Sequence, residues 1–209
     1  MMYKARQDSK IRATLLLLFC SLLAGCLGSG TKNGVRYYLV DPVTVDVAEI
    51  NTDNQLAIEL IDLNIPQYLE RFQIVTRNGE NRLRFSENNQ WGENLRKNLL
   101  RTLAINLASR LSTIDIGSPL NRSATLPDYR VQVHIAQFEL DSDGEVQLSA
   151  RWQLTNADEE ELGMYYASLQ SDDQIEDGDY DQIVADMQAL FAVLCDQISA
   201  SILVLEHKR

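Results

Sequence analysis

The sequence predicts a single α+β domain in which two amphipathic helices cover a mostly antiparallel or mixed sheet. Three observations predict this class. Short β-branched and aromatic runs fill the first part of residues 36–209, a leucine-rich helical pattern follows, and further alternating strands lead to a last helical pattern. The order strands, helix, strands, helix is typical of helices packed on one sheet.

Runs of β-branched and aromatic residues predict the first strands. The sequence VRYYLVDP precedes VTVDVAEI (43–50), and residues 55–65 form a longer run that ends at Pro66. Residues 72–86 hold two short strand candidates around Asn-Gly-Glu-Asn, which predicts a hairpin. In residues 55–65 apolar side chains occupy both phases. This indicates a strand buried on both faces, or apolar surface that lies between copies or lines an opening.

Two stretches have the periodicity of amphipathic helices. Over residues 91–112 a leucine recurs every four positions after Trp91. Over residues 180–205 large apolar side chains form a wider face, and Asp179 is placed to cap the helix N-terminus. Each apolar face requires a partner surface, which we expect the sheet to supply.

Three strands are predicted between the two helices, at residues 128–140, 144–155 and 161–170. A turn at residues 141–144 joins the first two, and the second alternates apolar and polar side chains throughout. In the first strand the apolar phase slips after Ile135, which predicts a β-bulge or a strand that is apolar on both faces.

The N-terminus has the layout of a secretory signal peptide, because basic residues precede an apolar run shorter than the roughly 20 residues of a membrane span. Leu23-Ala24-Gly25-Cys26 resembles a bacterial lipobox. Residues 1–25 are therefore predicted to be cleaved, and Cys26 is predicted to carry a diacylglyceryl group. Stable anchoring takes at least two acyl chains, which this group supplies, and palmitate is expected among them. Residues 26–35 then form a flexible tether. The alternative is a plain signal peptide or signal anchor that contains cysteine.

Charge and cysteine content exclude several classes of protein. Without the predicted signal peptide, which holds four basic residues and Asp8, 15 basic and 29 acidic residues remain, a net charge of −14. This acidity argues against a nucleic-acid partner and against a body lying on an anionic lipid surface. Cys195 would be the remaining free cysteine, so no intramolecular disulfide is expected, and its apolar neighbours predict a buried thiol in a helix rather than a nucleophile.

Motifs for catalysis, cofactors and metals are missing from the sequence: it has no G-x-S-x-G, H-E-x-x-H, C-x-x-C or glycine-rich phosphate loop. We therefore expect no catalytic residue, no cofactor and no metal. His134 falls at the polar phase of its strand and is interpreted as a surface or edge residue, and His207 lies in the C-terminal tail. The acidic stretches 158–161 and 172–181 lack the order of a calcium loop and are predicted to be solvated turns.

Several stretches resemble the ABC-transport auxiliary lipoproteins, including the PqiC (YmbA-like) group. They are YYLVDP (37–42), IPQYLERFQIVTR (65–77), the Trp-led segment 91–111 and residues 128–154. The resemblance implies a non-enzymatic partner of an MCE-domain protein and, in Pqi-like systems, of a polytopic inner-membrane protein. Such assemblies move phospholipid between the two membranes, and the resemblance implies a lipoprotein ring at the outer-membrane end.

Several alternatives remain open at this point. An aspartate directly after the lipidated cysteine usually means retention in the inner membrane of enteric bacteria. Leu27 occupies this position and favours the outer membrane in a host that sorts lipoproteins by this rule. Pro66, Tyr68 and Leu69 pack the edge of the core or contact a partner, and Trp91 is a core residue or a lipid contact. Surplus apolar surface would predict a closed homo-oligomer with a partly apolar lumen. Competing functions are a membrane-tethered periplasmic hydrolase with an unrecognised site and a structural envelope lipoprotein.

Overall fold

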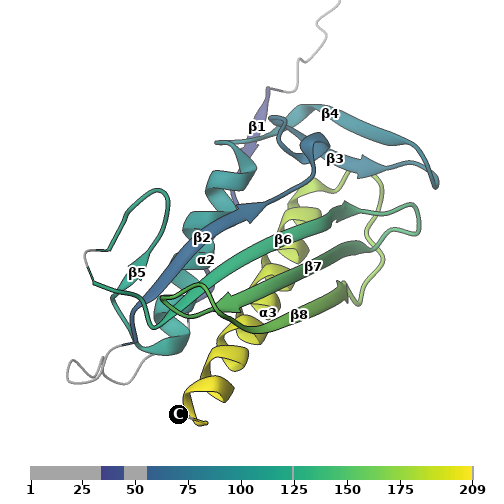
Figure 1. The fold of residues 1–209 in the computed structure, drawn as a ribbon. Coiled ribbons are helices and arrows are strands. Elements are labelled where there is room, and N and C mark those ends of the chain that lie inside the picture. The colour runs from purple at the N-terminus through teal and green to yellow at the C-terminus, as the bar shows by residue number, and fades with distance from the viewer. Residues whose placement is uncertain (1–33, 45–55, 124, 209) are drawn as a thin grey trace, which may run out of the picture. The chain divides into compact units, whose positions relative to one another are not determined.

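The computed structural model describes residues 34–44, 56–123 and 125–208, and these form one α+β domain (Figure 1). The predicted signal peptide, Cys26, nearly all of the tether and most of the strand predicted at residues 43–50 lie outside the described residues. Eight strands form one mixed sheet, and two helices cover one of its faces, which confirms the predicted class. In chain order the elements are β1 (Arg36–Tyr38), β2 (Ile58–Asn64), η2 (Gln67–Leu69), β3 (Gln73–Arg77), β4 (Leu83–Trp91), α2 (Leu95–Leu111), β5 (Ile116–Gly117), β6 (Tyr129–Leu140), β7 (Val146–Thr155), β8 (Glu161–Gln170) and α3 (Tyr180–Glu206).

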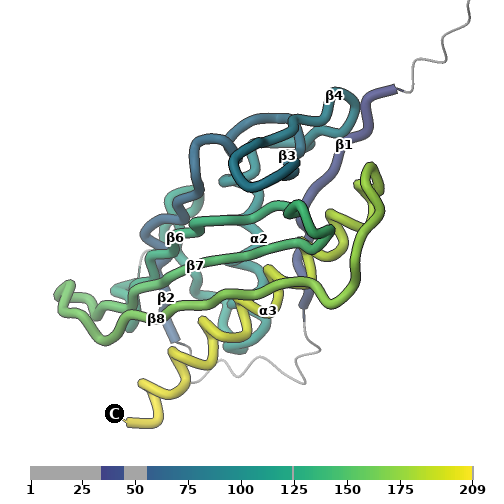
Figure 2. The backbone as a smooth tube through the Cα atoms, turned by 90° about the vertical axis from the view of Figure 1, so that its right-hand side faces the viewer, coloured from purple at the N-terminus to yellow at the C-terminus, as the bar shows by residue number. Residues whose placement is uncertain are grey.

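Strand β6 is the centre of the sheet. It pairs antiparallel with β7 along its whole length, and β7 pairs antiparallel with the edge strand β8. On its other side, β6 pairs in parallel with β2 over its first half and with β3 at Thr76 and Leu140. Strands β4 and β1 continue outward from β3, so β1, β4 and β3 form a separate arm of the sheet, called the β1 arm below (Figure 2).

Two bulges set the face to which the strands direct their apolar side chains. In β6 the register shifts between Ile135 and Gln137, so the predicted bulge is confirmed. In β2 it shifts between Leu60 and Asp62, and this places Leu63 in the core together with Leu60. The two apolar phases of residues 55–65 therefore result from a bulge and not from burial on both faces, and Ile61 is the large side chain that this strand leaves exposed.

Helix α2 begins four residues later than predicted. Trp91 is the last residue of β4, where its backbone N–H donates to the Phe72 carbonyl, and its side chain is buried. The Asn94 side chain caps the helix by accepting a hydrogen bond from the Lys97 N–H. The predicted start at residue 91 is therefore wrong, because the apolar spacing of four extends across the end of a strand. Trp91 is a core residue.

Helix α3 follows the prediction closely. Asp179 accepts a hydrogen bond from the Gln182 N–H and caps the N-terminus as expected. Among the described residues, α3 is the helix that is long and apolar enough to cross a membrane, but half of its most apolar window is buried inside the domain. There it packs on β6, β7, β8 and α2, for example through Phe191, whose ring lies 6.2 Å from that of Phe138.

Candidate interaction surfaces

A buried carboxylate holds the motif IPQYLERFQIVTR against the central strand. Glu139 of β6 is completely buried and accepts hydrogen bonds from Arg77 Nε (2.6 Å), Tyr68 Oη (2.8 Å) and the Phe138 N–H (3.0 Å). Burial, together with the charge of Glu139, raises the pKa of Tyr68, so its hydroxyl remains a donor. Tyr68 and the buried Leu69 therefore stabilise the edge of the core, which was one of the two interpretations of this motif.

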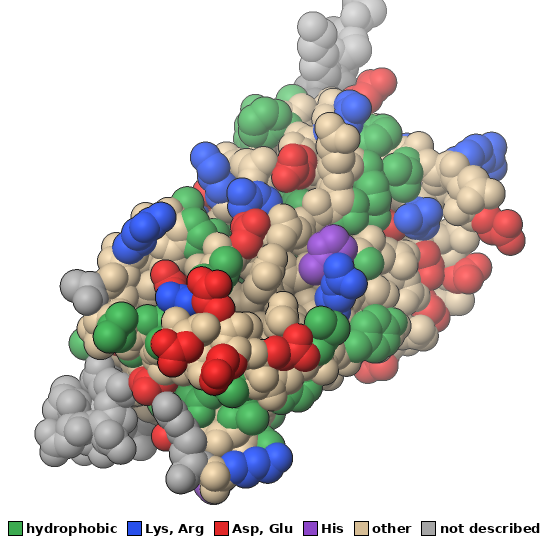
Figure 3. Space-filling view, viewed as in Figure 1, with side chains coloured by type: hydrophobic (Ala, Val, Ile, Leu, Met, Phe, Trp, Pro, Cys, Tyr) green, Lys and Arg blue, Asp and Glu red, His purple; other side chains and the backbone are tan. Residues whose placement is uncertain are grey.

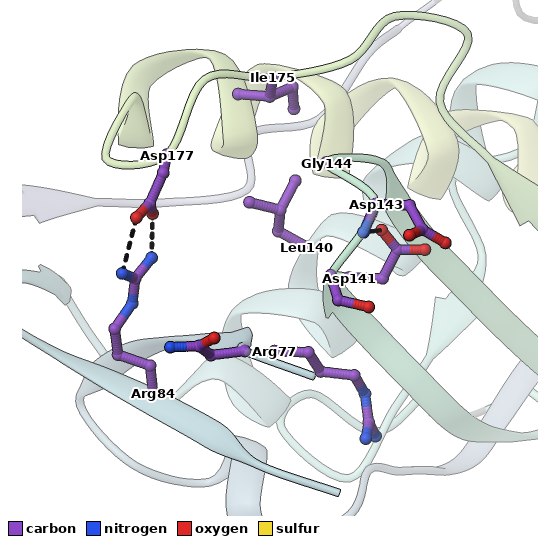
Figure 4. A pocket seen from close by; sticks show the side chains of 10 residues that line it. Arg77, Arg84, Leu140, Asp141, Asp143, Gly144, Ile175 and Asp177 are labelled. Carbon is purple, nitrogen blue, oxygen red and sulfur yellow. Dashed lines mark hydrogen bonds and ion pairs between the residues drawn. The ribbon is translucent and has the colours of Figure 1, made fainter. Parts of the chain in front are cut away.

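A cavity of about 320 Å³ lies next to this network, between the β3–β4 hairpin, the β6–β7 turn and the loop before α3 (Figure 4). Across this cavity, Arg84 forms a bidentate ion pair with Asp177. Asp141 Oδ1 accepts hydrogen bonds from the backbone of Asp143 and Glu145 and thereby closes the predicted turn. Among the described residues, no group of three or more His, Cys, Asp or Glu could hold a metal ion. Of the carboxylates that line this cavity, that of Asp141 forms the turn and that of Asp177 pairs with Arg84.

Two candidate nucleophiles among the described residues, Cys195 and Ser201, are buried and hydrogen-bonded. Burial raises the pKa of Cys195 to about 12, so the thiol stays protonated at neutral pH. The Asn106 amide donates to its sulfur at 3.5 Å. Ser201 accepts a hydrogen bond from the indole N–H of Trp152 and donates to the Ile198 carbonyl. A serine or cysteine nucleophile activated by a base is not found in the part of the chain that the structure describes.

Sequence reasoning missed a row of polar side chains on α2. Asn98 accepts the Val40 N–H (2.8 Å) and donates to the Val40 carbonyl (3.1 Å), and Thr102 donates to the same carbonyl (2.7 Å). Asn106 accepts the Val43 N–H (2.9 Å). These side chains supply the hydrogen bonds that a neighbouring strand would give to the segment after β1. The sequence signal for this row is the spacing of four residues, which places the three polar side chains along one buried face of the helix.

The sheet face opposite the helices is uncovered (Figure 3). A row crosses it from His134 on β6 through Arg151 on β7 to Tyr166 on β8. Tyr166 and Met164 are more than 60% exposed. A shallow cavity of about 300 Å³ lies on this face. It is lined by Asn64, Gln132, His134, Arg151, Trp152, Gln153 and Met164.

This uncovered surface, called the open face below, ends at β8, an edge strand in the described sheet. His134 was predicted to be a surface or edge residue; it is exposed on the central strand β6, so the first alternative is confirmed. The open face therefore combines exposed apolar side chains, an arginine and a strand edge that is free for further pairing.

The β1 arm is a second exposed region of the domain. Tyr37 pairs with Gln90, which in turn pairs with Gln73, so Tyr37 and Gln73 lie in one row across the three strands. The guanidinium of Arg71 lies 5.0 Å from the centre of the Phe85 ring. Phe72 precedes Gln73 and is mostly exposed. We call Tyr37, Phe72 and Phe85 the aromatic set of the β1 arm.

These features define an α+β domain with two exposed surfaces and no enclosed catalytic cleft among its described residues. A family model, the ABC-type transport auxiliary lipoprotein component, matches residues 37–199, and the chain belongs to this family. The resemblance found in the sequence is thereby confirmed. Membership gives the chain an accessory role in transport and the character of a membrane-anchored periplasmic lipoprotein.

Two crystal structures have the same fold. One, of an uncharacterized protein, is 20% identical with a TM-score of 0.65, and the match covers 81% of this chain and 99% of that chain. The other is protein XCC0632 from Xanthomonas campestris, of the family model DUF330, which is 10% identical with a TM-score of 0.63 over 83% of this chain and 98% of that chain. A comparison with curated proteins found no match.

Proposed function

We propose that this chain is a non-enzymatic lipoprotein of the outer membrane that serves an MCE-type, Pqi-like system for phospholipid transport between the two membranes. In this function it is anchored through Cys26, docks an MCE-domain protein that works with an inner-membrane partner, and assembles into a homo-oligomeric ring for lipid passage. The observation that carries the proposal is the family match over residues 37–199, which covers nearly all of the described domain.

The chemistry of the described residues supports binding rather than catalysis. The buried carboxylate of Glu139 has three donors, and the thiol of Cys195 is protonated and enclosed. Neither group is free to act as a base or nucleophile. No arrangement of these residues favours the alternative of a membrane-tethered hydrolase.

The open face supports docking and assembly. An edge strand presents unpaired backbone N–H and C=O groups that a strand of another chain can join, and β8 also exposes Met164 and Tyr166. Copies that join head to tail close into a ring when the rotation between them allows it. We therefore assign the contact between copies to the open face and its β8 edge.

Mass measurement of the mature lipoprotein in detergent tests this assignment. We expect a single oligomer for the wild type, and a monomer for the double variant Met164→Glu/Tyr166→Glu, because two buried carboxylates in an interface lack partners. Leu126→Glu is the matched control, since Leu126 is also highly exposed but lies outside the open face. A wild-type monomer at tens of micromolar would refute the ring. An unchanged oligomer in the double variant would remove the open face from the interface.

Two variants test the anchor and its membrane. Cys26→Ser should abolish labelling by an acyl analogue and leave the precursor uncleaved, because the thioether forms on the sulfur of that residue. Equal labelling of the variant would refute the assignment of Cys26. In an enteric host the wild type should fractionate with the outer membrane, and Leu27→Asp should shift it to the inner membrane. A wild type already found in the inner membrane would contradict the proposed location.

A single assay tests the transport partner. The wild type should be retained by an immobilised MCE-domain protein encoded beside it, and the double variant Met164→Glu/Tyr166→Glu reports whether the same face is used. Genes for an MCE-domain protein next to this one would support the proposal. Retention of the chain by no such protein would favour the structural envelope lipoprotein instead.

A further inference from the structure

The β1 arm lies at the end of the domain where the chain leaves its predicted tether. Eight residues separate Cys26 from Val35, and the nine steps of chain between them span at most about 30 Å when fully extended. As a random coil it averages about 15–18 Å. If Cys26 is lipidated, as the proposed function requires, the start of β1 is held within this distance of the bilayer.

The opposite end of the domain is much farther from the tether. An ion pair of 3.1 Å between Arg36 and Asp181 places β1 beside the N-terminal end of α3. The 27 residues of α3 span about 40 Å at 1.5 Å per residue. Figures 1 and 2 both show the β1 arm at the end of the domain away from the C-terminus of α3.

Both ends of the domain carry exposed acidic side chains, and those of residues 172–181 lie beside the β1 arm, where Asp181 pairs with Arg36. The acidic loop between β7 and β8 lies near the C-terminal end of α3, since Tyr129 bonds to Glu206 (2.8 Å) and its neighbour Arg130 contacts Glu159 (3.3 Å). Residues 158–161 of this loop are Asp-Glu-Glu-Glu, and all four are exposed. An anionic bilayer would repel the acidic residues of either end, so charge does not decide which end faces it. The two ends differ in their aromatic side chains, because the exposed Tyr37 and Phe72 belong to the end of the β1 arm.

The aromatic set is fixed in position by the sheet. The Trp91 N–H donates to the Phe72 carbonyl (2.6 Å), and Trp91 pairs with Tyr38 on its other side. Tyr37 and Phe72 are therefore held on either side of β4, and they are 68% and 62% exposed. Arg71 over the Phe85 ring adds a cation beside them.

Tyr37 has a ring with a polar edge, which prefers the boundary between headgroups and acyl chains, and Phe72 and Phe85 add apolar area beside it. From this chemistry and the short tether, we infer that the aromatic set of the β1 arm contacts the headgroup region of the membrane that holds the chain's own lipid. The contact rests on the anchor of the proposed function. It directs the acidic loop between β7 and β8 away from the bilayer. It also depends on apolar contact, and its salt dependence is therefore weak.

Quenching by brominated lipid tests the contact. The mature lipoprotein is reconstituted into vesicles of phosphatidylethanolamine with a minor share of phosphatidylglycerol, with acyl chains brominated near the headgroup. Tyr37→Trp and Phe72→Trp each add one fluorophore to the buried Trp91 and Trp152, and the wild type gives their background. Leu126→Trp is the matched control, because Leu126 is 82% exposed, lies outside the open face and precedes Tyr129, which bonds to Glu206 at the far end of α3.

The expected result is a loss of the added emission for Tyr37→Trp and Phe72→Trp in brominated vesicles, and none for Leu126→Trp. Raised salt should not restore the emission. A chain that floats with the vesicles but shows equal quenching at all three positions overturns the contact alone. Emission that shifts to the blue without quenching identifies a protein neighbour and also overturns it. A chain that does not float overturns the anchor, and with it this contact.

Discussion

Arg77→Met removes the cation that faces the buried carboxylate of Glu139. The variant leaves a completely buried carboxylate with two neutral donors, Tyr68 and the Phe138 N–H. Loss of one partner of a buried ion pair costs about 3–5 kcal/mol. Because the Arg77 side chain is 27% exposed, water can enter its place in the variant and partly solvate the Glu139 carboxylate. We therefore expect a loss at the lower end of this range, about 3 kcal/mol.

For a domain of this size, a loss of about 3 kcal/mol lowers the midpoint of thermal unfolding by roughly 6–12 °C. Circular dichroism of the mature protein during heating measures this shift, and urea unfolding gives the free energy. Glu139→Gln/Arg77→Met should be more stable than Arg77→Met, because a neutral amide does not require the cation. The effects of the two substitutions on the free energy of unfolding would then not add, and a double-mutant cycle would measure this as a coupling between Arg77 and Glu139.

Arg84→Met is the matched control for the same change. Arg84 lines the same cavity as Arg77, but its partner Asp177 is 70% exposed (Figure 4). Exposed pairs contribute about 0–1 kcal/mol, so a small shift is expected. If Arg77→Met is no more destabilising than Arg84→Met, the Glu139 network does not hold the β1 arm, and the reasoning is wrong.

Three further predictions concern α2 and α3. Asn98→Ala loses both bonds to Val40 and leaves buried backbone groups unpaired, so urea unfolding should show a loss of about 2 kcal/mol, against almost none for the exposed Asn88→Ala. The thiol of Cys195 should react with a thiol reagent at pH 8 only after unfolding, and rapid labelling of the folded protein would contradict its burial. Folding raises the pKa of Cys195 from 9.0 to about 12. The thiol's contribution to stability is therefore complete below pH 9 and is lost as the pH rises toward 12. The difference in unfolding free energy between wild type and Cys195→Ala should shrink over that range.

Much of the fold was predictable because its signals are local. The cap at Asp179, the periodicity of α3 and the phase slip after Ile135 all depend on residues that are neighbours in the sequence, and the structure confirms each. The start of α2 was not predictable from spacing. Trp91 continues the apolar spacing of the helix while its backbone belongs to a strand, and the cap at Asn94 decides the boundary.

The contacts around the candidate surfaces were less accessible from the sequence. Glu139 is 71 residues from Tyr68 and 62 from Arg77, and no periodicity connects them. The resemblance identified the motif that contains Tyr68 and Arg77 but not its partner. The bulge in β2 was equally hidden, because alternation alone cannot distinguish a strand with two buried faces from one whose register shifts.

The β1 arm joins the central sheet through few backbone bonds, since β3 pairs with β6 only at Thr76 and Leu140 within the described residues. Such a junction would act as a hinge if backbone pairing alone held it. Side chains bridge it instead: Glu139 binds Arg77 and Tyr68 from the sheet, and Asn98 fixes the segment after β1 to α2.

If the chain is anchored through Cys26 as proposed, the arm transmits the position of the tethered end to the open face, because both belong to one braced sheet. An anchored accessory that must present one face to a partner requires this rigidity, since a short tether limits distance but not orientation. If the chain functions as proposed, a variant that weakens the brace, such as Arg77→Met, should retain acylation at Cys26 and bind the proposed MCE-domain partner less tightly at temperatures where the domain is folded. Unchanged binding by this variant would show that the orientation of the open face does not depend on the β1 arm.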